Sequence, residues 1–540
     1  MNVEALGHDT VFGTAADDRP EPSSATRMVE FLRAYSRNFL NSRLVDERRS
    51  LPPALTSDFA DAGLLGLQIP QKFGGQDLSH TDMNRVFTQL GAIDANLAVF
   101  CAVHNTLGTA PIQQSAAEDV RSRVLPRLAT GQALATSAIS EPGIGSHLRG
   151  MATSATRNPD GSYTINGRKK WISLGGDARY VNVFALVRDD DGRPQGITGF
   201  LVDSRTPGFE IGPEMLTLGL RGVPQYDLRF RELRVPASAV LGGEGDGLST
   251  AKAAFMGGRI VLAAMAAGAA MRSLELVQRF TSGRVVATGY LAENGRIRQL
   301  LAGAGAAVQA VETLIGRIAT WRDAGHDVPD AWYFCAKILG CELGWSAIDA
   351  ALQVLGARGF LDTNTVGQHF RDYRLFRIFE GSTEALSVYL GTKLIKNPGE
   401  LAKLVRPVQP NARVLAQVDR VVALAARLPG DDAAQHIHAA MIGELACWAL
   451  LAAVTSDAGH RSAMHGYTTS WTEDQLRRRL DHAHPGASRD LPTGAEFAAY
   501  VAGCADAIGE VDQRRWPGEE WSADPLLRRR GGPQRRACEQ

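Results

Sequence analysis

The chain has 540 residues and a mass of 58.0 kDa, which is too long for one ordinary core and indicates about two to four domains. Lysine plus arginine and aspartate plus glutamate both number 58, so the formal charge is zero. This balance disfavours a nucleic-acid-binding protein and gives no general attraction to an acidic membrane surface. With 44% hydrophobic and 21% charged residues, the composition is that of a globular protein.

The six cysteines contain no C-x-x-C pair. This spacing disfavours a disulfide framework and a structural zinc site, and it fits a reducing cytoplasm. We therefore expect a cytoplasmic protein without a bound metal.

The start of the chain has acidic residues and prolines where a signal peptide would have a basic start and an apolar core, so we expect residues 1–27 to form a flexible tail. The longest apolar stretches are Ile260–Met271 and Ala439–Val454. Both are shorter than the roughly 20 residues that a bilayer requires. On this argument we expect no membrane span.

The remaining chain divides into four parts by its hydrophobic pattern. Residues 28–134 have apolar residues at three- and four-residue spacing, which predicts a helical domain. Over 135–247, short alternating runs such as NVFALV and ITGFLV are separated by DG, NG and PG turns, which predicts antiparallel strands. Helical periodicity returns over 248–397. Residues 398–540 are predicted to form an additional, mainly helical extension with a solvated basic tail.

Two glycine-rich stretches could suit phosphate binding. The first, G-x-G-x-x-V at Gly303–Val308, lies in an Ala-rich helical run with no strand before it, so close helix packing is the better interpretation. The second, LGGEGDG at 241–247, precedes a helix. Phosphate binding stays open there, and a simple connection is the preferred interpretation.

Two segments could form a cofactor site. In SAISEPGIGSH (137–147) a strand-like run ends in a loop that exposes backbone N–H groups and hydroxyls, which suits a polar cofactor edge or a phosphate. In INGRKKWISLGG (165–176), Trp171 and Ser173 share one strand face, where an aromatic side chain could pack against a planar ring. Taken alone, Trp171 is better interpreted as a core residue.

A third segment, HFRDYRLFRIFEGSTEALSVYLG (369–391), places Glu380 between an apolar run and Gly381. Apolar neighbours raise the pKa of a carboxylate by desolvation, as a general base near neutral pH requires. The alternative, a surface glutamate that caps the next segment, stays open on spacing alone.

From about Met28 to Asn397 the chain resembles the acyl-CoA dehydrogenase family. The resemblance is carried by the order and spacing of AGLLGLQIP (62–70), SEPGIGS (140–146), INGRKKWIS (165–173), LGLRG (218–222), LRVPASAVLG (233–242), QVLGARGF (353–360) and FRDYRLFRIFEGSTE (370–384). It implies an α+β architecture with a helical N-terminal domain, a middle antiparallel β-domain and a C-terminal four-helix bundle, with FAD held between them.

The resemblance also implies α,β-dehydrogenation of an acyl thioester. A carboxylate takes the α-proton, which the hydrogen-bonded thioester carbonyl acidifies, while the β-hydrogen leaves as hydride to flavin N5. By its motif, Glu380 is that base. Some relatives place the base just before the Arg of the first long bundle helix, but that position is Gly258 here, before Arg259.

Cofactor contacts follow from the same motifs. The flavin and its diphosphate would be contacted by Ile139, Ser140, Ser146, Trp171, Ser173, Ser382 and Glu384. In the family the adenosine end is held partly by a neighbouring subunit, through R-x-x-F-G and Q-x-x-G-G motifs. Their counterparts are Arg284 for the first motif, and Gln353, Gly356 and Ala357 for the second.

Departures from the family pattern concern the cofactor. Ala287 and Thr288 stand where the first adenosine motif has Phe and Gly, and His147 stands where Asp is usual. These changes put the packing around the adenine in doubt. Longer, very-long-chain relatives also carry a C-terminal helical domain, which serves membrane association or dimer contacts. Here QLRRRL (475–480) does not place its arginines on one helix face, so a solvated helix is the preferred interpretation.

The leading hypothesis is therefore an FAD-dependent acyl-thioester dehydrogenase. Its thioester is on CoA or on an acyl carrier protein, as in relatives from secondary-metabolite pathways. An electron-transfer flavoprotein is the implied acceptor, and a homodimer or a dimer of dimers is expected. One alternative is a flavin monooxygenase or oxidase on the same fold, which does not need Glu380. Another is a degenerate, non-catalytic partner subunit, which the altered adenosine motif would suit.

Overall fold

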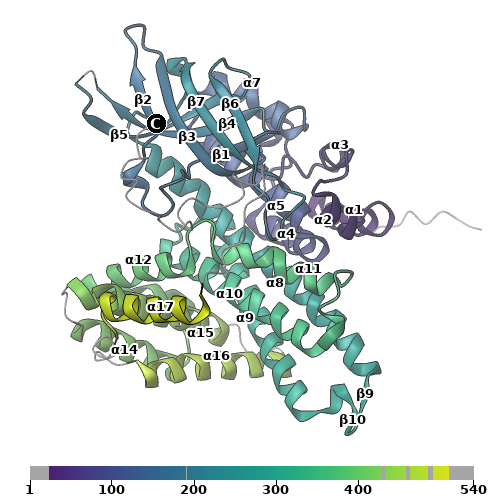
Figure 1. Ribbon diagram of the computed structural model, residues 1–540. Coiled ribbons are helices and arrows are strands. Elements are labelled where there is room, and N and C mark those ends of the chain that lie inside the picture. Colours follow the sequence, from purple (N-terminus) through teal and green to yellow (C-terminus); the bar gives the residue numbers. More distant parts are fainter. Residues whose placement is uncertain (1–22, 190, 429–431, 458–461, 484–490, 510–540) are drawn as a thin grey trace, which may run out of the picture.

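The computed structural model describes residues 23–189, 191–428, 432–457, 462–483 and 491–509. Figure 1 shows a twisted sheet beside a group of short helices, with two groups of longer helices below them. The predicted tail up to residue 22, the basic tail after residue 509 and the intervening gaps lie outside the described residues.

The N-terminal domain is helical, as the periodicity predicts. Its first helix begins within the segment that we expected to be a tail, because the Ser23 side chain accepts a hydrogen bond from the Thr26 N–H and caps it. The elements are α1 (Ser24–Asn38), α2 (Ser42–Arg48), α3 (Leu55–Asp61), η1 (Gln71–Phe73), α4 (His80–Ile93), α5 (Ala95–Ala102), the π-helix η2 (Val103–Gly108), α6 (Thr109–Ser115) and α7 (Glu118–Ala129).

The middle domain is an 8-stranded sheet in the order β6-β7-β3-β2-β4-β5-β8, with β1 paired to β4. Its pairings are antiparallel, as expected, except that β1 and β2 both run parallel to β4. The strands are β1 (Ala135–Ala138), β2 (Ser154–Arg157), β3 (Tyr163–Ser173), β4 (Tyr180–Arg188), β5 (Pro194–Asp203), β6 (Phe209–Glu214), β7 (Gln225–Val235) and β8 (Val240–Leu241), with 3-10 turns η3 (Leu148–Gly150) and η4 (Ala237–Ala239).

Long helices rich in Ala and Leu follow, and they share one hydrophobic core with the N-terminal helices. The glycine-rich stretch 241–247 connects β8 to the first of them. The elements are α8 (Gly247–Gly283), the hairpin β9 (Val285–Val286) and β10 (Gly289–Tyr290), η5 (Leu291–Glu293), α9 (Gly295–Asp323), α10 (Asp330–Leu355), η6 (Gly356–Arg358), α11 (Thr365–Tyr373), η7 (Arg374–Arg377) and α12 (Thr383–Lys396).

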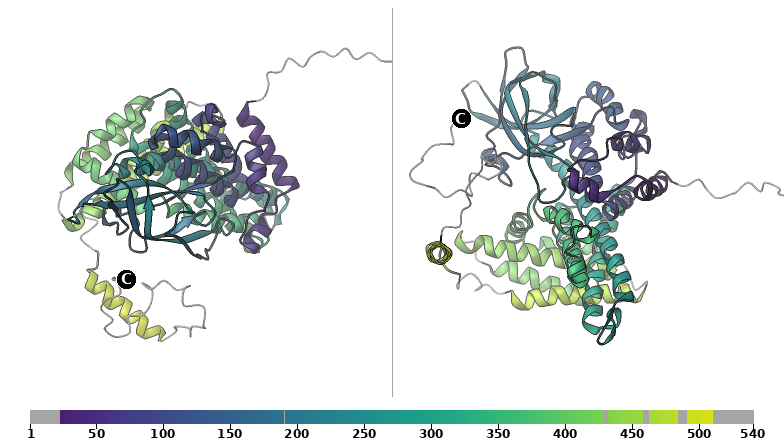
Figure 2. Two further views of the ribbon diagram at one scale, coloured as in Figure 1. Left: turned by 90° about the horizontal axis from the view of Figure 1, so that it is seen from above. Right: turned by 45° about the vertical axis from the view of Figure 1, so that its right-hand side comes forward.

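The extension packs on this bundle and shares its core. Gly391 of α12 and Gly443 of α15 cross so closely that a Cβ at Gly443 would lie 2.0 Å from the Ser387 carbonyl oxygen. The elements are α13 (Glu400–Val405), η8 (Arg406–Val408), α14 (Ala412–Arg427), α15 (Asp432–Asp457), α16 (Ala463–His482) and α17 (Gly494–Ile508). Figure 2 shows α17 apart from the other helices, and none of its residues is buried.

The helices α9 and α16 contain two of the motifs that the sequence analysis singled out. The motif Gly303–Val308 lies inside α9, where a Cβ at Gly305 would come within 3.1 Å of Met464 of α16, so close helix packing is confirmed. In the QLRRRL stretch, Arg477 and Arg478 both pair with Asp474, whereas the Arg479 guanidinium lies 4.1 Å from the centre of a tryptophan ring of α15.

Within the residues that the structure describes, three helices are long and apolar enough to cross a membrane by length and composition alone: α8, Asp330–Arg358 and Gln435–Asp457. The sequence argument that the apolar stretches are too short was therefore wrong, because glycines, alanines and single polar residues extend each apolar window. Half or more of each window is buried inside the fold, where these helices pack on one another.

Candidate active site

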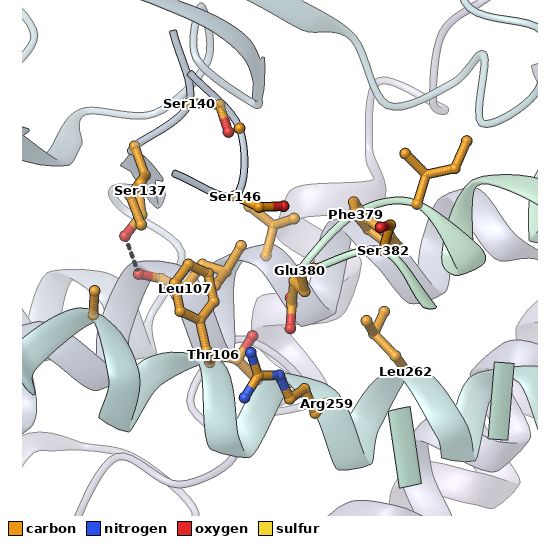
Figure 3. A pocket seen from close by; sticks show the side chains of 18 of the residues that line it. Thr106, Leu107, Ser137, Ser140, Ser146, Arg259, Leu262, Phe379, Glu380 and Ser382 are labelled. Carbon is orange, nitrogen blue, oxygen red and sulfur yellow. Dashed lines mark hydrogen bonds between the residues drawn. The ribbon is translucent and has the colours of Figure 1, made fainter. Parts of the chain in front are cut away.

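A cavity of about 840 Å³ lies between the sheet domain and the long helices. The predicted residues that the structure brings together around it are Ile139, Ser140, Ser146, Trp171, Ser173, Glu380 and Ser382. Figure 3 shows Ser137, Ser140 and Ser146 on the side of the sheet domain, with Glu380 and Arg259 reaching into the cavity from the helical side.

The cavity has a polar side and an apolar side. Hydroxyl groups of the sheet domain line the first, from Thr136, Ser137, Ser140, Ser146 and Ser173. The apolar side comes from α5, the π-helix and α8, with Val99, Ala102, Val103, Leu262 and Met265. Such a site can hold a ligand that is polar along one edge and aliphatic along another.

A buried ion pair fixes the loop that carries Ser140 and Ser146. The Glu141 carboxylate lies 2.9 Å from Lys169 Nζ and accepts hydrogen bonds from the Ala152 and Thr153 N–H groups. Lys169 Nζ also donates to the Ile139 carbonyl oxygen at 3.0 Å. Burial alone would raise the pKa of Glu141, but the Lys169 charge and these hydrogen bonds hold it below its ordinary value. The loop is therefore tied to β3 at its base.

Trp171 is presented to the cavity by an irregularity in β3. Its φ is 60°, in the left-handed region, and the register with β7 shifts between Lys169 and Ile172. The Trp171 side chain is 43% exposed and lines the cavity, with Lys170 Nζ 4.8 Å from its ring centre. The interpretation of Trp171 as a core residue was therefore wrong, because the bulge turns the ring out of the sheet.

Glu380 lies in a tight turn between η7 and α12. Its φ is 54° and that of Gly381 is 95°, so a non-glycine residue here adopts a backbone that side chains usually avoid. Ser382 ends the turn, because its side chain accepts a hydrogen bond from the Ala385 N–H and caps α12. The helix cap is thus Ser382, and the alternative in which Glu380 is a surface capping residue was wrong.

The charge of Glu380 is controlled by its surroundings. Burial raises the pKa of Glu380 to about 7, and the nearby positive charges of Arg259 and Lys337 oppose this rise. Glu380 Oε2 has no hydrogen-bond partner within the described part of the chain. A carboxylate that is poised near neutral pH and not committed to another donor is able to accept a proton from a ligand in the cavity.

Lys337 was missed by the sequence reasoning. It is fully buried on α10, and its Nζ lacks a hydrogen-bond partner among the residues that the structure describes. Burial lowers the pKa of Lys337, while the Glu380 charge raises it. A signal was present, because Lys337 is a single charge in the apolar run AWYFCAKILGC. A buried charge without a partner is costly and points to an electrostatic role.

The remaining predicted residues lie outside the main cavity. Glu384 lines a shallower recess that shares Ser146 and Ser382 with it. The four residues expected to reach a neighbouring subunit, Arg284, Gln353, Gly356 and Ala357, are all exposed and do not line the cavity. They lie at one end of the bundle, where the Arg358 guanidinium is 5.5 Å from the centre of the Phe280 ring.

The fold is that of proteins in which a β-sheet domain and a helical bundle form one ligand-binding cavity between them. Three family models match the chain: acyl-CoA dehydrogenase N-terminal domain over residues 26–132, middle domain over 136–233 and C-terminal domain over 245–392. The chain belongs to the acyl-CoA dehydrogenase family.

Individual relatives agree with this assignment. An acyl-CoA dehydrogenase of Bacillus subtilis is 30% identical over 354 residues, which is 66% of this chain and 93% of that protein. The probable acyl-CoA dehydrogenase FadE10 of Mycobacterium tuberculosis is 28% identical over 70% of this chain, and the match spans only 60% of FadE10. An acyl-CoA dehydrogenase from Bacillus anthracis, crystallised with FAD, has a TM-score of 0.75 and 20% identity over 92% of this chain and 93% of its own. That last likeness shows that the fold, including much of the extension, occurs elsewhere.

Proposed function

We propose that this protein catalyses the FAD-dependent α,β-dehydrogenation of an acyl thioester. The observation that carries the proposal is Glu380, a carboxylate that lines the cavity and whose pKa is raised by burial to about 7. This is the state that a base needs in order to remove a weakly acidic C–H proton at neutral pH.

The residues around the cavity fit a flavin cofactor. The exposed ring of Trp171 offers a flat surface to a planar ring system, and the row of hydroxyls that includes Ser140, Ser146 and Ser173 suits its polar edge. When FAD is bound there, it supplies the chemistry of hydride acceptance. Solved relatives hold this cofactor: the Bacillus anthracis acyl-CoA dehydrogenase is complexed with FAD, and a glutaryl-CoA dehydrogenase of Mycobacterium smegmatis is complexed with FADH2.

The chain itself would bind the acyl group, exclude water and move one proton. The apolar side of the cavity, with Val99, Val103 and Leu262, suits an aliphatic acyl chain. Glu380 Oε2 would take the α-proton, which makes the side chain neutral. The charges of Arg259 and Lys337 favour the ionised form before transfer, so they keep part of Glu380 ready at neutral pH.

The finer parts of the proposal concern partners. The thioester would be carried by CoA or by an acyl carrier protein, and an electron-transfer flavoprotein would collect the electrons. A homodimer or dimer of dimers is supported by exposed apolar side chains near the end of the bundle that holds Arg284 and Gln353, namely Val285, Tyr290, Phe360 and Leu361. We also propose a cytoplasmic location, in line with the cysteine spacing.

An anaerobic visible spectrum of the purified protein tests the function. Acyl-CoA and acyl-carrier thioesters of several lengths would be added to the wild type and to Glu380→Gln, with Glu275→Gln as a control. Glu275 is an exposed glutamate paired with Arg272 and Arg279 on α8. We expect flavin absorbance to bleach in the wild type and the control, and not in Glu380→Gln.

Other outcomes would support the competing functions. A yellow protein that ignores every thioester but consumes oxygen with a flavin reductase would support an oxygen-using enzyme. A colourless protein that cannot be reconstituted with FAD would support a non-catalytic partner subunit.

A further inference from the structure

The turn that presents Glu380 is held at both ends by one carboxylate. Glu342 of α10 forms an ion pair with Arg377 on the N-terminal side of the turn, with 2.6 Å between Glu342 Oε2 and Arg377 Nε. Its other oxygen accepts a hydrogen bond from Thr383 Oγ1, on the C-terminal side, also at 2.6 Å. Arg377 and Thr383 stand three residues before and three residues after Glu380.

α10 makes a second contact with the N-terminal side of the turn. The Arg377 guanidinium lies 4.9 Å from the centre of the Trp345 ring, and Trp345 Nε1 donates a hydrogen bond to the Phe370 carbonyl oxygen at 3.0 Å. Arg377 is therefore fixed both by charge and by packing. Thr383, the first residue of α12, has the Glu342 contact in addition to the Ser382 cap.

We call the contacts of Glu342 with Arg377 and Thr383 the clamp. It is needed because the backbone of the turn is strained at Glu380. Glu380 has a φ of 54°, and a non-glycine residue in this region keeps its conformation only where the surrounding structure fixes it. No hydrogen bond within the described residues holds Glu380 Oε2 itself. The position of this carboxylate oxygen therefore depends on the backbone of the turn.

We infer that Glu342 is a positioning residue, which closes the Glu380 turn from both sides and holds the base at its reacting position. The inference rests on the proposed function for its catalytic consequence, while the clamp is a property of the fold. A carboxylate is required because it has two acceptor oxygens. A glutamine would offer one acceptor and one donor, so it cannot satisfy both Thr383 and the Arg377 charge.

Two variants break the clamp in different ways. Glu342→Gln removes the charge, whereas Thr383→Val removes one hydrogen bond and leaves every charge in place. Thr383→Ser restores the hydroxyl and serves as the rescue. Glu275→Gln is the matched control, since Glu275 also pairs with two arginines but lies on the exposed face of α8.

The first measurement is the rate of anaerobic flavin bleaching in the holoenzyme at saturating thioester. We expect a loss of about 10- to 100-fold in Glu342→Gln and Thr383→Val, since a displacement of about 1 Å can cost about 100-fold in rate. The half-saturating thioester concentration should stay within about twofold, because the acyl-binding side is untouched. Thr383→Ser and Glu275→Gln should bleach at the wild-type rate.

The second measurement is amide hydrogen exchange over residues 374–386 of the FAD-bound protein, which does not require turnover. Exchange in this segment should be faster in Glu342→Gln and Thr383→Val than in the wild type and both controls. Unchanged exchange in both variants would overturn the clamp. If none of the thioesters bleaches the flavin of the wild type, the proposed function is overturned. The hydrogen-exchange data would still decide whether Glu342 holds the turn.

Discussion

Gly258 provides the space that the carboxylate of Glu380 occupies. A Cβ atom at Gly258 would lie 2.6 Å from Glu380 Oε2 and 2.9 Å from Oε1. Glycine in the middle of a helix such as α8 costs stability, and here the missing side chain makes room for a charged group. A glycine at position 258 therefore leaves room for the carboxylate that we propose as the base.

A methyl group at Gly258 should displace the base. We expect Gly258→Ala to slow anaerobic flavin bleaching by about 100-fold, because the carboxylate must move by about 1 Å. Gly257→Ala is the matched control, since a Cβ at Gly257 meets nothing within 4 Å. Equal rates in the two variants would show that the carboxylate does not react from this position.

The pH dependence of the reaction should follow Glu380. Burial raises its pKa to about 7, and only the ionised form accepts a proton, so the bleaching rate should rise with pH through about 7 and then level off. A stopped-flow pH series on the wild type measures this directly. A bleaching rate that stays constant from roughly pH 5.5 to about 8.5 would exclude a base whose pKa is raised to about 7.

The raised pKa of Glu380 should also make the folded protein less stable as the pH rises, which is opposite to its effect on the bleaching rate. The folded protein keeps a proton on Glu380 that the unfolded chain releases near its ordinary pKa of 4.5. This contribution to stability is present below pH 4.5 and is lost as the pH rises through about 7. As the pH rises through this window, the melting temperature of Glu380→Gln should therefore increase relative to that of the wild type. A difference that does not change with pH would contradict the raised pKa.

Lys337 should lower the pKa of the base by its charge. Replacing it with methionine removes a buried ammonium whose Nζ has no hydrogen-bond partner within the described ranges, so the fold should be retained. We expect Lys337→Met to move the pH midpoint of bleaching upward, because Glu380 loses a favourable charge. Lys403→Met, at an exposed lysine of α13, should leave the midpoint unchanged. A downward shift in Lys337→Met would contradict this role.

The sequence predicted Glu380 as the candidate base but not the groups that control its charge. That prediction came from the resemblance to the family motif, because the apolar run before Glu380 and Gly381 after it left a surface glutamate open. Glu342 contacts this turn from α10, and Lys337 of the same helix acts on the charge of Glu380, both about 40 residues earlier in the chain. The single charge in an apolar run marks Lys337 as unusual, but no short-range pattern reports which residue either group acts on. The strand pattern taken alone favoured a core residue at Trp171, since a bulge that turns a strand residue outward leaves no periodic signal, whereas the resemblance placed Trp171 at the cofactor site.

The extension should stabilise α12, the helix that follows Glu380, through the close crossing of α12 and α15. The helix α12 begins three residues after Glu380 and crosses α15 where Gly391 meets Gly443. We expect Gly443→Ala to lower the free energy of unfolding by about 1–3 kcal/mol, because its Cβ would lie 2.0 Å from the Ser387 carbonyl oxygen and force the helices apart. Gly399→Ala, where a Cβ meets nothing within 4 Å, should change it little. Thermal unfolding of both variants, with FAD absorbance followed in parallel, compares the two. If Gly443→Ala melts like the wild type, the crossing can relax and the extension does not restrain α12.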